Sequence, residues 1–531
     1  MERRVKSAGL SRRGLLKWGA AAAGLGVLPP WVPANQIAAA ALPGASTATS
    51  TPKRGGTLTV ARTATLQDFD PLRGGMAHYI SQRGLYNSLL HYDAQLNPQP
   101  ELAEQWSFSP DGRTLTLKVR EGVKFHTGRM LTSQDVKFSV EYGQRTQYSP
   151  MYQAYQTIKG VEAPDQNTVV LKFDKVNPGI FDLLDVLWVV DKETIGSVAS
   201  KDAGTGPFRL EKYIPNDRVE MVPFKDYWDK GKPYLERLII RQLPDADTLV
   251  LNLEAGAVDC VFQPNFTEIA RLQAAGGKYI VDPGAPGGQI NNIGINVKFG
   301  PLKDKRVRQA IAWSMDRARF CKTILQGLAE PTCLIWPRHS WAYFKDLEGK
   351  IGYDLNKAKA LLREAGVEKG FDVEILTSSA ESPSFGARAA MLQADLKTIG
   401  INARVSNVDA ALYNSRVIKG DIQILIHEYG RANRDPGTTL TGAKAWYVEK
   451  DGAWTHYDSE EWVRLRDEMQ STMDREKRRA AARKIQEMAL DECFTIVVSD
   501  SPKPWVYTTH VKGFTYDLNN APFSGEIWLD R

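Results

Sequence analysis

Residues 109–136 read SPDGRTLTLKVREGVKFHTGRMLTSQDV and carry turn, strand and helix signals in succession. The Pro-Asp-Gly step at 110–112 predicts a turn, because proline presets φ and glycine accepts a positive φ. Thr114–Val119 alternates polar and apolar side chains, as a half-buried strand does. Thr132 and Asp135 have the spacing of a capping box, so a helix is expected to begin there. This stretch therefore predicts a hairpin followed by a helix.

Further strands and helices are predicted along the whole chain. The strands are Thr57–Ala61, Thr168–Phe173, Arg218–Val222, Leu238–Gln242, Ile290–Val297, Phe371–Leu376, Ile401–Val405, Asp421–His427 and Thr495–Val498. The helices are Val136–Tyr142, Asp247–Glu254 with Asp247 as its cap, two that Asp304 and Asp354 cap, Met391–Ile399 and Arg475–Asp491. The last third alternates helix and strand, which indicates an α/β organisation with helices covering a sheet.

The first 41 residues have the organisation of an export signal. The run Ser11-Arg12-Arg13-Gly14-Leu15-Leu16-Lys17 precedes an apolar stretch and three alanines at 38–40. This order is typical of a secretory signal peptide, and the arginine pair resembles a twin-arginine signal. A membrane anchor would need about 20 apolar residues. No cysteine precedes Cys260, so we expect a periplasmic protein without a lipid anchor.

The charge of the chain comes mostly from this signal. The net charge is +6, and residues 1–41 hold six basic side chains against one acidic side chain, which leaves +1 for the remainder. That balance gives no support for a nucleic-acid partner, which would require a sustained basic excess. The chain has four cysteines and no C-x-x-C spacing, which predicts buried or singly bridged thiols with the pairing left open.

Motifs of catalysis are missing from the sequence. It holds no G-x-S-x-G elbow, no H-E-x-x-H and no phosphate-binding loop. The seven histidines are scattered, whereas metal ligands come in clusters. We therefore expect no enzyme, no metal and no cofactor, although carboxylates that pair only in the folded chain stay open.

The order of segments resembles the extracellular solute-binding proteins of family 5, the peptide, opine and nickel type of ABC importers. The matching stretches are Gly55–Leu58, Phe69–Pro71, Tyr86–Leu90, Leu102–Trp106, Ser109–Thr114, Leu117–Gly128, Thr132–Val136, Gly204–Phe208, Tyr227–Trp228, Asp304–Ile311 and Asp435–Pro436. The resemblance covers about residues 55–515 and implies a periplasmic-binding-protein-like α/β fold of type II, cluster C. It also implies two main α/β lobes joined by a hinge, with a smaller inserted lobe.

The resemblance further implies the following division of the chain. Residues 1–41 are the twin-arginine signal peptide and 42–54 a flexible lead-in. Lobe I takes 55–90, 201–288 and 497–531, lobe II takes 91–200, and lobe III takes 289–496. The ligand is expected between lobes I and III, which close over it.

The expected ligand segment departs from the peptide-binding pattern of the family. It reads Tyr429-Gly430-Arg431-Ala432-Asn433-Arg434-Asp435, with Ala432 at the position where peptide-binding members carry the aspartate that pairs with an α-ammonium. An alanine cannot neutralise a cation, whereas the two arginines suit a carboxylate or phosphate. The hypothesis is an anionic ligand that lacks a free amino terminus. The alternative is that both arginines face solvent or pair with Asp435.

Other expectations complete the predicted site and its partners. Gly75, Met76 and His78 follow a family motif whose loop tends to line the ligand site. Trp336, Trp446 and Trp505 are candidate stacking surfaces. Gly437 stands where nickel-binding relatives use a histidine, which disfavours a metal ligand.

The expected function is the periplasmic substrate-binding component of an ABC importer. It would act as a monomer with an oligopeptide, opine, saccharide or related small organic solute. Its partners would be an inner-membrane permease with its ATPases and, during export, the twin-arginine translocase. The alternatives are a secreted enzyme on the same scaffold, which turnover of a captured ligand would reveal, and a sensor subunit, which neighbouring permease genes would argue against.

Overall fold

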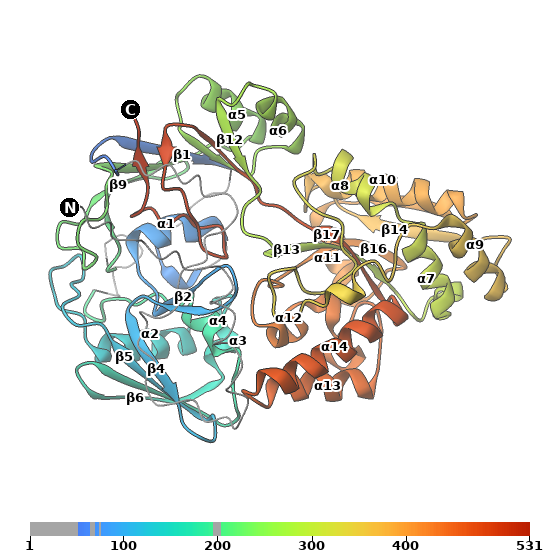
Figure 1. The fold of residues 1–531 in the computed structure, drawn as a ribbon, viewed down its shortest axis with the longest axis horizontal. Helices are drawn as coiled ribbons and strands as arrows, with labels where there is room; N and C mark the ends of the chain where they lie inside the picture. The colour runs from blue at the N-terminus through green and yellow to red at the C-terminus, as the bar shows by residue number, and fades with distance from the viewer. Residues whose placement is uncertain (1–50, 64–68, 74–75, 195–202) are drawn as a thin grey trace, which may run out of the picture. The chain divides into compact units, whose positions relative to one another are not determined.

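Three larger β-sheets organise the chain in the computed structural model (Figure 1), which describes residues 51–63, 69–73, 76–194 and 203–531. The expected signal peptide and most of the lead-in lie outside these residues, as does Gly75. We use lobe I, lobe II and lobe III for the bodies that surround the three sheets. Among the described helices, none combines the length and the apolar character that crossing a membrane requires.

Lobe I is built on a seven-stranded sheet in the order β12-β18-β11-β1-β10-β9-β8. Its strands come from three separate parts of the chain: β1 (Thr57–Arg62), then β8 (Phe208–Ile214), β9 (Arg218–Pro223), β10 (Arg237–Gln242), β11 (Cys260–Phe262) and β12 (Tyr279–Asp282), and finally β18 (Trp505–Thr508). The helices are α1 (Met76–Leu85), α5 (Ala246–Glu254) and α6 (Phe266–Gln273), and β19 (Val511–Lys512) pairs with β20 (Trp528–Leu529).

Lobe II is inserted between the first two of these parts. Its four-stranded antiparallel sheet has the order β4-β5-β7-β6, and a short pair, β2 and β3, precedes it. The elements are β2 (Leu90–Tyr92), β3 (Pro98–Pro100), β4 (Ala103–Phe108), β5 (Thr114–Val119), α2 (Ser133–Arg145), α3 (Tyr152–Tyr155), β6 (Ile158–Asp165), β7 (Thr168–Phe173) and α4 (Ile180–Leu184).

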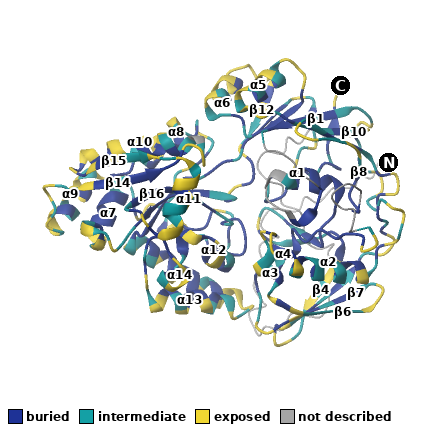
Figure 2. Cartoon of the chain, turned by 180° about the vertical axis from the view of Figure 1, so that it is seen from behind, coloured by how far each residue is buried: buried dark blue, intermediate teal, exposed yellow. Residues whose placement is uncertain are grey.

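Lobe III has a five-stranded sheet in the order β15-β14-β16-β13-β17. Its strands are β13 (Gln289–Ile295), β14 (Asp372–Thr377), β15 (Asn402–Asn407), β16 (Ile424–Gly430) and β17 (Thr495–Asp500). Its helices are α7 (Lys305–Ser314), α8 (Arg317–Thr323), α9 (Leu355–Glu364), α10 (Pro383–Thr398), α11 (Ala410–Lys419), α12 (Pro436–Gly442), α13 (Glu460–Gln470) and α14 (Arg475–Glu492). Helices lie on both faces, so most strand residues are buried, whereas edge strand β15 and the outer helix surfaces are partly exposed (Figure 2).

Two adjacent connections join lobe I to lobe III. One runs from β12 to β13 and the other returns from β17 to β18. They are tied together, because the backbone N–H of Lys503 donates to the carbonyl of Pro283 at 3.1 Å and that of Ser501 donates to Gln289 at 2.9 Å. The first connection contains Gly284, whose positive φ of 82° an L side chain rarely adopts.

Lobes I and II share a buried arginine. The Arg83 guanidinium of α1 is 2.9 Å from Glu101 at the start of lobe II and 2.8 Å from Asp517 in the C-terminal part of lobe I. All three side chains are less than 10% exposed. Removing one partner would leave a buried charge uncompensated, so the contact fixes lobe II to lobe I.

Most sequence predictions of local structure are confirmed, with differences at helix starts. The β5 and β7 bounds agree, and Asp304 and Asp354 cap α7 and α9 by accepting backbone N–H bonds. The predicted cap of α5 is wrong: the cap is Asp245, not Asp247. Helix α10 begins at Pro383, eight residues before the predicted start at Met391. The cysteines are buried and unpaired: Cys260, Cys321, Cys333 and Cys493.

Candidate functional site

The segment from Tyr429 to Asp435 connects β16 to α12 at a junction of all three lobes. Its side chains reach Pro150 and Asp185 of lobe II and the carbonyl of Leu518 in the C-terminal part of lobe I. Figure 1 shows α12 facing α3 and α4 in the middle of the view. The segment therefore has the position expected of a site between lobes.

The first part of this segment belongs to the core of lobe III. Tyr429 is 2% exposed, and its hydroxyl donates to the carbonyl of Ile335 at 2.7 Å. Burial raises the pKa of this phenol well above its ordinary value. Gly430 pairs with Gln289 in the β13–β16 ladder, and Ala432 is completely buried. Neither the Tyr429 hydroxyl nor the Ala432 methyl is presented to a ligand in this arrangement.

Arg431 carries a charge that is not matched by a carboxylate. Its backbone is left-handed, with a φ of 68°, which is uncommon for a residue other than glycine. Its guanidinium lies 3.4 Å from the carbonyl of Pro150 and 3.5 Å from the sulfur of Met151, both in lobe II. Within the described part of the chain, no acidic side chain forms an ion pair with Arg431. It is half-buried and so remains accessible to an anion.

Arg434 differs from Arg431 because its charge is neutralised. One guanidinium nitrogen donates to Asp185 of lobe II at 2.5 Å, and the other donates to the amide oxygen of Asn519. Burial opposes the charged form, but Asp185 and Asp182 outweigh it and raise the pKa of Arg434. Of the two predicted alternatives, solvent exposure and pairing with Asp435, the structure has neither for Arg434.

Asp435 is the cap of α12. One of its oxygens accepts the backbone N–H of Gly437 at 2.9 Å and a hydrogen bond from Arg478 of α14. The Asp435 side chain is 8% exposed. Its two contacts lie within lobe III, so its visible role is to fix the start of α12 rather than to face another lobe.

The other predicted residues lie in or just before helix α1, which carries one side chain close to the same junction. Gly75 lies outside the described residues, and Met76 begins α1 without a described side chain. His78 is half-buried, and its carbonyl accepts a bond from Ser81 at 2.9 Å. The next residue, Tyr79, is near the arginines: burial raises its pKa, and the positive charges of Arg434 and Arg431 oppose that rise.

Sequence reasoning missed the acidic partners of this junction and misjudged the aromatic ones. Asp182 and Asp185 stand in an otherwise apolar run, Ile180-Phe181-Asp182-Leu183-Leu184-Asp185, where a charge needs a partner. That pattern was the available signal. The three tryptophans proposed as stacking surfaces are at most 1% exposed and belong to the core, so that prediction is wrong: Trp336, Trp446 and Trp505.

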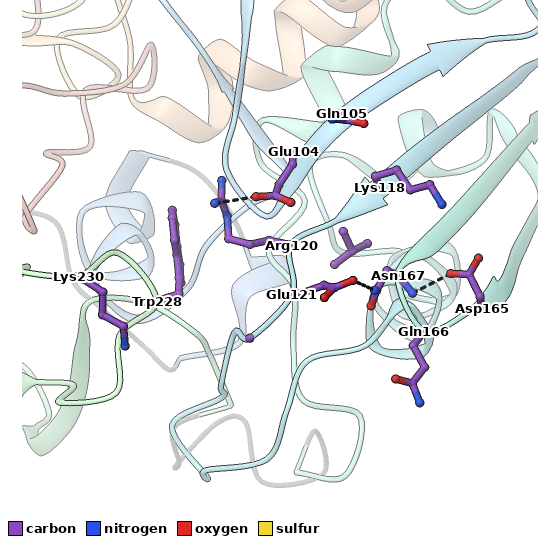
Figure 3. A pocket seen from close by; sticks show the side chains of 12 residues that line it. Glu104, Gln105, Lys118, Arg120, Glu121, Asp165, Gln166, Asn167, Trp228 and Lys230 are labelled. Carbon is purple, nitrogen blue, oxygen red and sulfur yellow. Dashed lines mark hydrogen bonds and ion pairs between the residues drawn. The ribbon is translucent and has the colours of Figure 1, made fainter. Parts of the chain in front are cut away.

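A groove lies on lobe II, apart from this junction. It has a volume of about 1000 Å³ and includes Trp228 and Lys230 of lobe I (Figure 3). Arg120 crosses it, 2.9 Å from Glu104 and 4.4 Å from the centre of the Trp228 ring. Its central charge is thus already compensated, and none of its lining residues is a predicted site residue. We assign no ligand to it.

Two sheet-based lobes joined by paired connections, with a third lobe inserted in the first, define a periplasmic-binding-protein-like α/β protein. A sequence model described as bacterial extracellular solute-binding proteins, family 5, middle part, matches residues 97–447. The chain belongs to this family.

Curated relatives and solved structures are similar to this chain over most of its length. The dipeptide-binding protein of Escherichia coli is 26% identical over 85% of this chain and 90% of its own length. The heme-binding protein A of Haemophilus influenzae is 25% identical over 85% of each chain. The solved structure of the ABC transporter substrate-binding protein CtaP of Listeria monocytogenes matches with a TM-score of 0.80, at 22% identity, over 90% of this chain and 100% of that one. This last likeness supports the fold.

Proposed function

We propose that this chain is the solute-binding component of an ABC importer. After export through the twin-arginine translocase it would work in the periplasm as a monomer and deliver its solute to an inner-membrane permease with its ATPases. The family and the names of the relatives support the binding role, and the sequence of residues 11–17 supports the export route. The proposed role involves no chemical change of the solute.

The proposed solute binds between lobes I and III, against the segment Tyr429–Asp435 and the start of α1. Ligand binding would shift the equilibrium between open and closed lobes. The observation that carries the proposal is Arg431, a half-buried cation at this junction with no acidic partner in the described residues. A carboxylate or phosphate of the solute would satisfy its planar donors.

Ala432 narrows the proposed class of solute further. Ala432 is itself buried and offers no carboxylate to the junction, so a solute ammonium there would lack this counter-charge, and an uncompensated charge is costly. We therefore propose a solute without a free α-ammonium at this position. A relative named for heme, beside one named for dipeptide, shows that names within the family extend beyond peptides. Because Arg434 is engaged by Asp185, only Arg431 is retained as the anion anchor.

The test begins with mass spectrometry of the solute that purified mature protein releases on denaturation. We expect an acidic compound without a free amine. Its affinity is then measured by calorimetry for the wild type and for Arg431→Gln. A charge-assisted hydrogen bond contributes about 1.5–3 kcal/mol, so the dissociation constant should rise roughly 10- to 150-fold.

Arg404→Gln is the matched control, since Arg404 lies on edge strand β15 of the same lobe and is 76% exposed on its side chain. It removes the same charge and should leave the affinity unchanged. Release of a linear peptide with a free amine would contradict the proposed solute class. An unchanged affinity in Arg431→Gln would refute the role of this arginine.

A further inference from the structure

Helix α4 of lobe II and the residue that follows it carry two buried carboxylates. Asp182 is 8% exposed and Asp185 is fully buried. Within lobe II both are served by one residue: the Tyr92 hydroxyl donates to Asp182 at 2.8 Å and the Tyr92 backbone N–H donates to Asp185 at 3.3 Å. Buried carboxylates accept more than one hydrogen bond when they stay charged, so these donors alone do not complete the site.

Most of the remaining donors come from lobe III, and the Asn519 amide of lobe I adds a weaker contact to Asp185 at 3.5 Å. The backbone N–H of Asp435 donates to Asp182 at 3.1 Å, and the Thr438 hydroxyl donates to the other oxygen of Asp182. Arg434 donates to Asp185 at 2.5 Å. The carboxylate in α4 and the one directly after it therefore bind backbone, hydroxyl and guanidinium groups in and beside the first turn of α12.

The backbone of α4 is shaped for this contact. Gly179 precedes α4, and a Cβ at this position would lie 2.4 Å from the Thr438 methyl group. Only a residue without a side chain allows so close an approach. A second contact lies nearby, because a Cβ on Gly112 would stand 3.6 Å from the Met473 side chain. Both contacts join lobe II to lobe III away from the two connections between lobes I and III.

We infer that α4 is a latch that holds lobe III against the body formed by lobes I and II. Arg83 fixes lobe II to lobe I, so a bond between α4 and α12 restrains lobe III as well. All contacts of the latch are made by residues of this chain, so it should act without a solute. When it opens, both ions regain water, so the desolvation cost offsets much of the attraction and the closed form is held reversibly. Arg434 serves this latch instead of the solute.

The test uses the mature protein freed of solute by unfolding and refolding, with spin labels on lobe II and lobe III. Lys159→Cys and Ile418→Cys place the labels at exposed positions, 53% and 73% exposed respectively. The native cysteines are buried and leave these two sites selectively reactive. Double electron–electron resonance then reports the distribution of interlobe distances.

Two variants weaken the latch from opposite sides. Asp185→Asn removes the charge that faces Arg434, and Thr438→Val removes the hydroxyl that faces Asp182. Each should raise the population at long distances at least threefold. The control is Glu374→Gln, which breaks a 2.6 Å pair with Arg416 inside lobe III and should leave the distribution unchanged.

Two results would overturn the latch. One is a wild-type distance distribution in both latch variants, each shown by circular dichroism to be folded. The other is equal opening in the control variant. Because the protein carries no solute, neither result bears on the solute class proposed above, and Thr438→Val keeps the test open if Asp185→Asn does not fold.

Discussion

At the scale of single residues, the glycines at 204 and 206 lie against the end of α1, where the chain returns from lobe II to lobe I. A Cβ on Gly204 would stand 1.9 Å from the carbonyl oxygen of Leu85. The carbonyl of Gly204 accepts the backbone N–H of His126 at 2.9 Å, and that of Gly206 contacts the His126 ring at 3.0 Å. A side chain at either glycine would push backbone away from backbone.

Gly204→Ala should therefore destabilise the protein severely, by about 3 kcal/mol or more, because neither backbone can yield without breaking these bonds. Gly352→Ala is the matched control, since its Cβ would meet its nearest neighbour at an ordinary 3.6 Å. Thermal unfolding followed by circular dichroism compares the two. Equal melting temperatures would show that the approach to Leu85 is not tight in solution.

Single residues also show where sequence reasoning stops. The Gly-Thr-Gly-Pro-Phe run was recognisable, but the carbonyl of Leu85 that requires Gly204 lies 119 positions earlier and follows only from the fold. The tryptophans fail for a similar reason. A tryptophan can serve as a stacking surface for a ligand or as part of the core, and its residue type does not tell which. Trp336 and Trp446 are buried in the core.

At the scale of elements, local signals predicted strands well and helix ends less well. β5 follows strict alternation, which depends only on neighbours in sequence. In α5 the run Asp245-Ala246-Asp247 offers two candidate caps. Which of them caps the helix depends on where the preceding strand β10 ends, and the structure has Asp245 as the cap. In α10 the early start at Pro383 agrees with the preference of proline for the first helical turn.

A cap prediction belongs to this scale. Asp354 accepts the backbone N–H of Lys357 at 3.0 Å at the start of α9. Asp354→Ala should weaken α9 by about 1 kcal/mol. Native-state hydrogen exchange of the α9 amides should accelerate about fivefold where they exchange by local opening. Asp354→Asn keeps an accepting oxygen and should retain most of the protection. Equal acceleration in both variants would argue against a capping role.

At the scale of the whole molecule, the contacts of the lobe junction join residues that are far apart in sequence. Arg434 and Asp185 are 249 positions apart, and no local pattern pairs them. The sequence was sufficient to place Arg431 and Arg434 in one segment beside Ala432. It was not sufficient to separate their roles, because that separation depends on which arginine meets α4.

Stability of the whole molecule should fall as the pH falls below neutrality. Burial lowers the pKa of His126, His339 and His427 to about 4. An unfolded chain binds protons on these rings near pH 6.5, whereas the folded chain does not until about pH 4. The unfolded state therefore binds more protons in this window, and stability is lost as the pH falls. Burial raises the pKa of Asp500 to about 6. The folded chain therefore gains a proton there as the pH falls, which offsets the loss of stability from about one of the three histidines.

His427 is the residue with which to measure this effect. Its ring is buried against Trp454, with centroids 4.6 Å apart, and its Nδ1 has no hydrogen-bond partner in the described residues. His427→Gln removes one of the three titrating rings, so the loss of unfolding free energy from pH 7 to pH 4.5 should shrink by roughly 2–3 kcal/mol. Urea unfolding at several pH values measures it. The difference between the proteins at pH 8, where both side chains are neutral, gives the packing cost alone and is subtracted. Parallel stability curves for the two proteins would show that His427 gains its proton as readily in the folded chain as in the unfolded one.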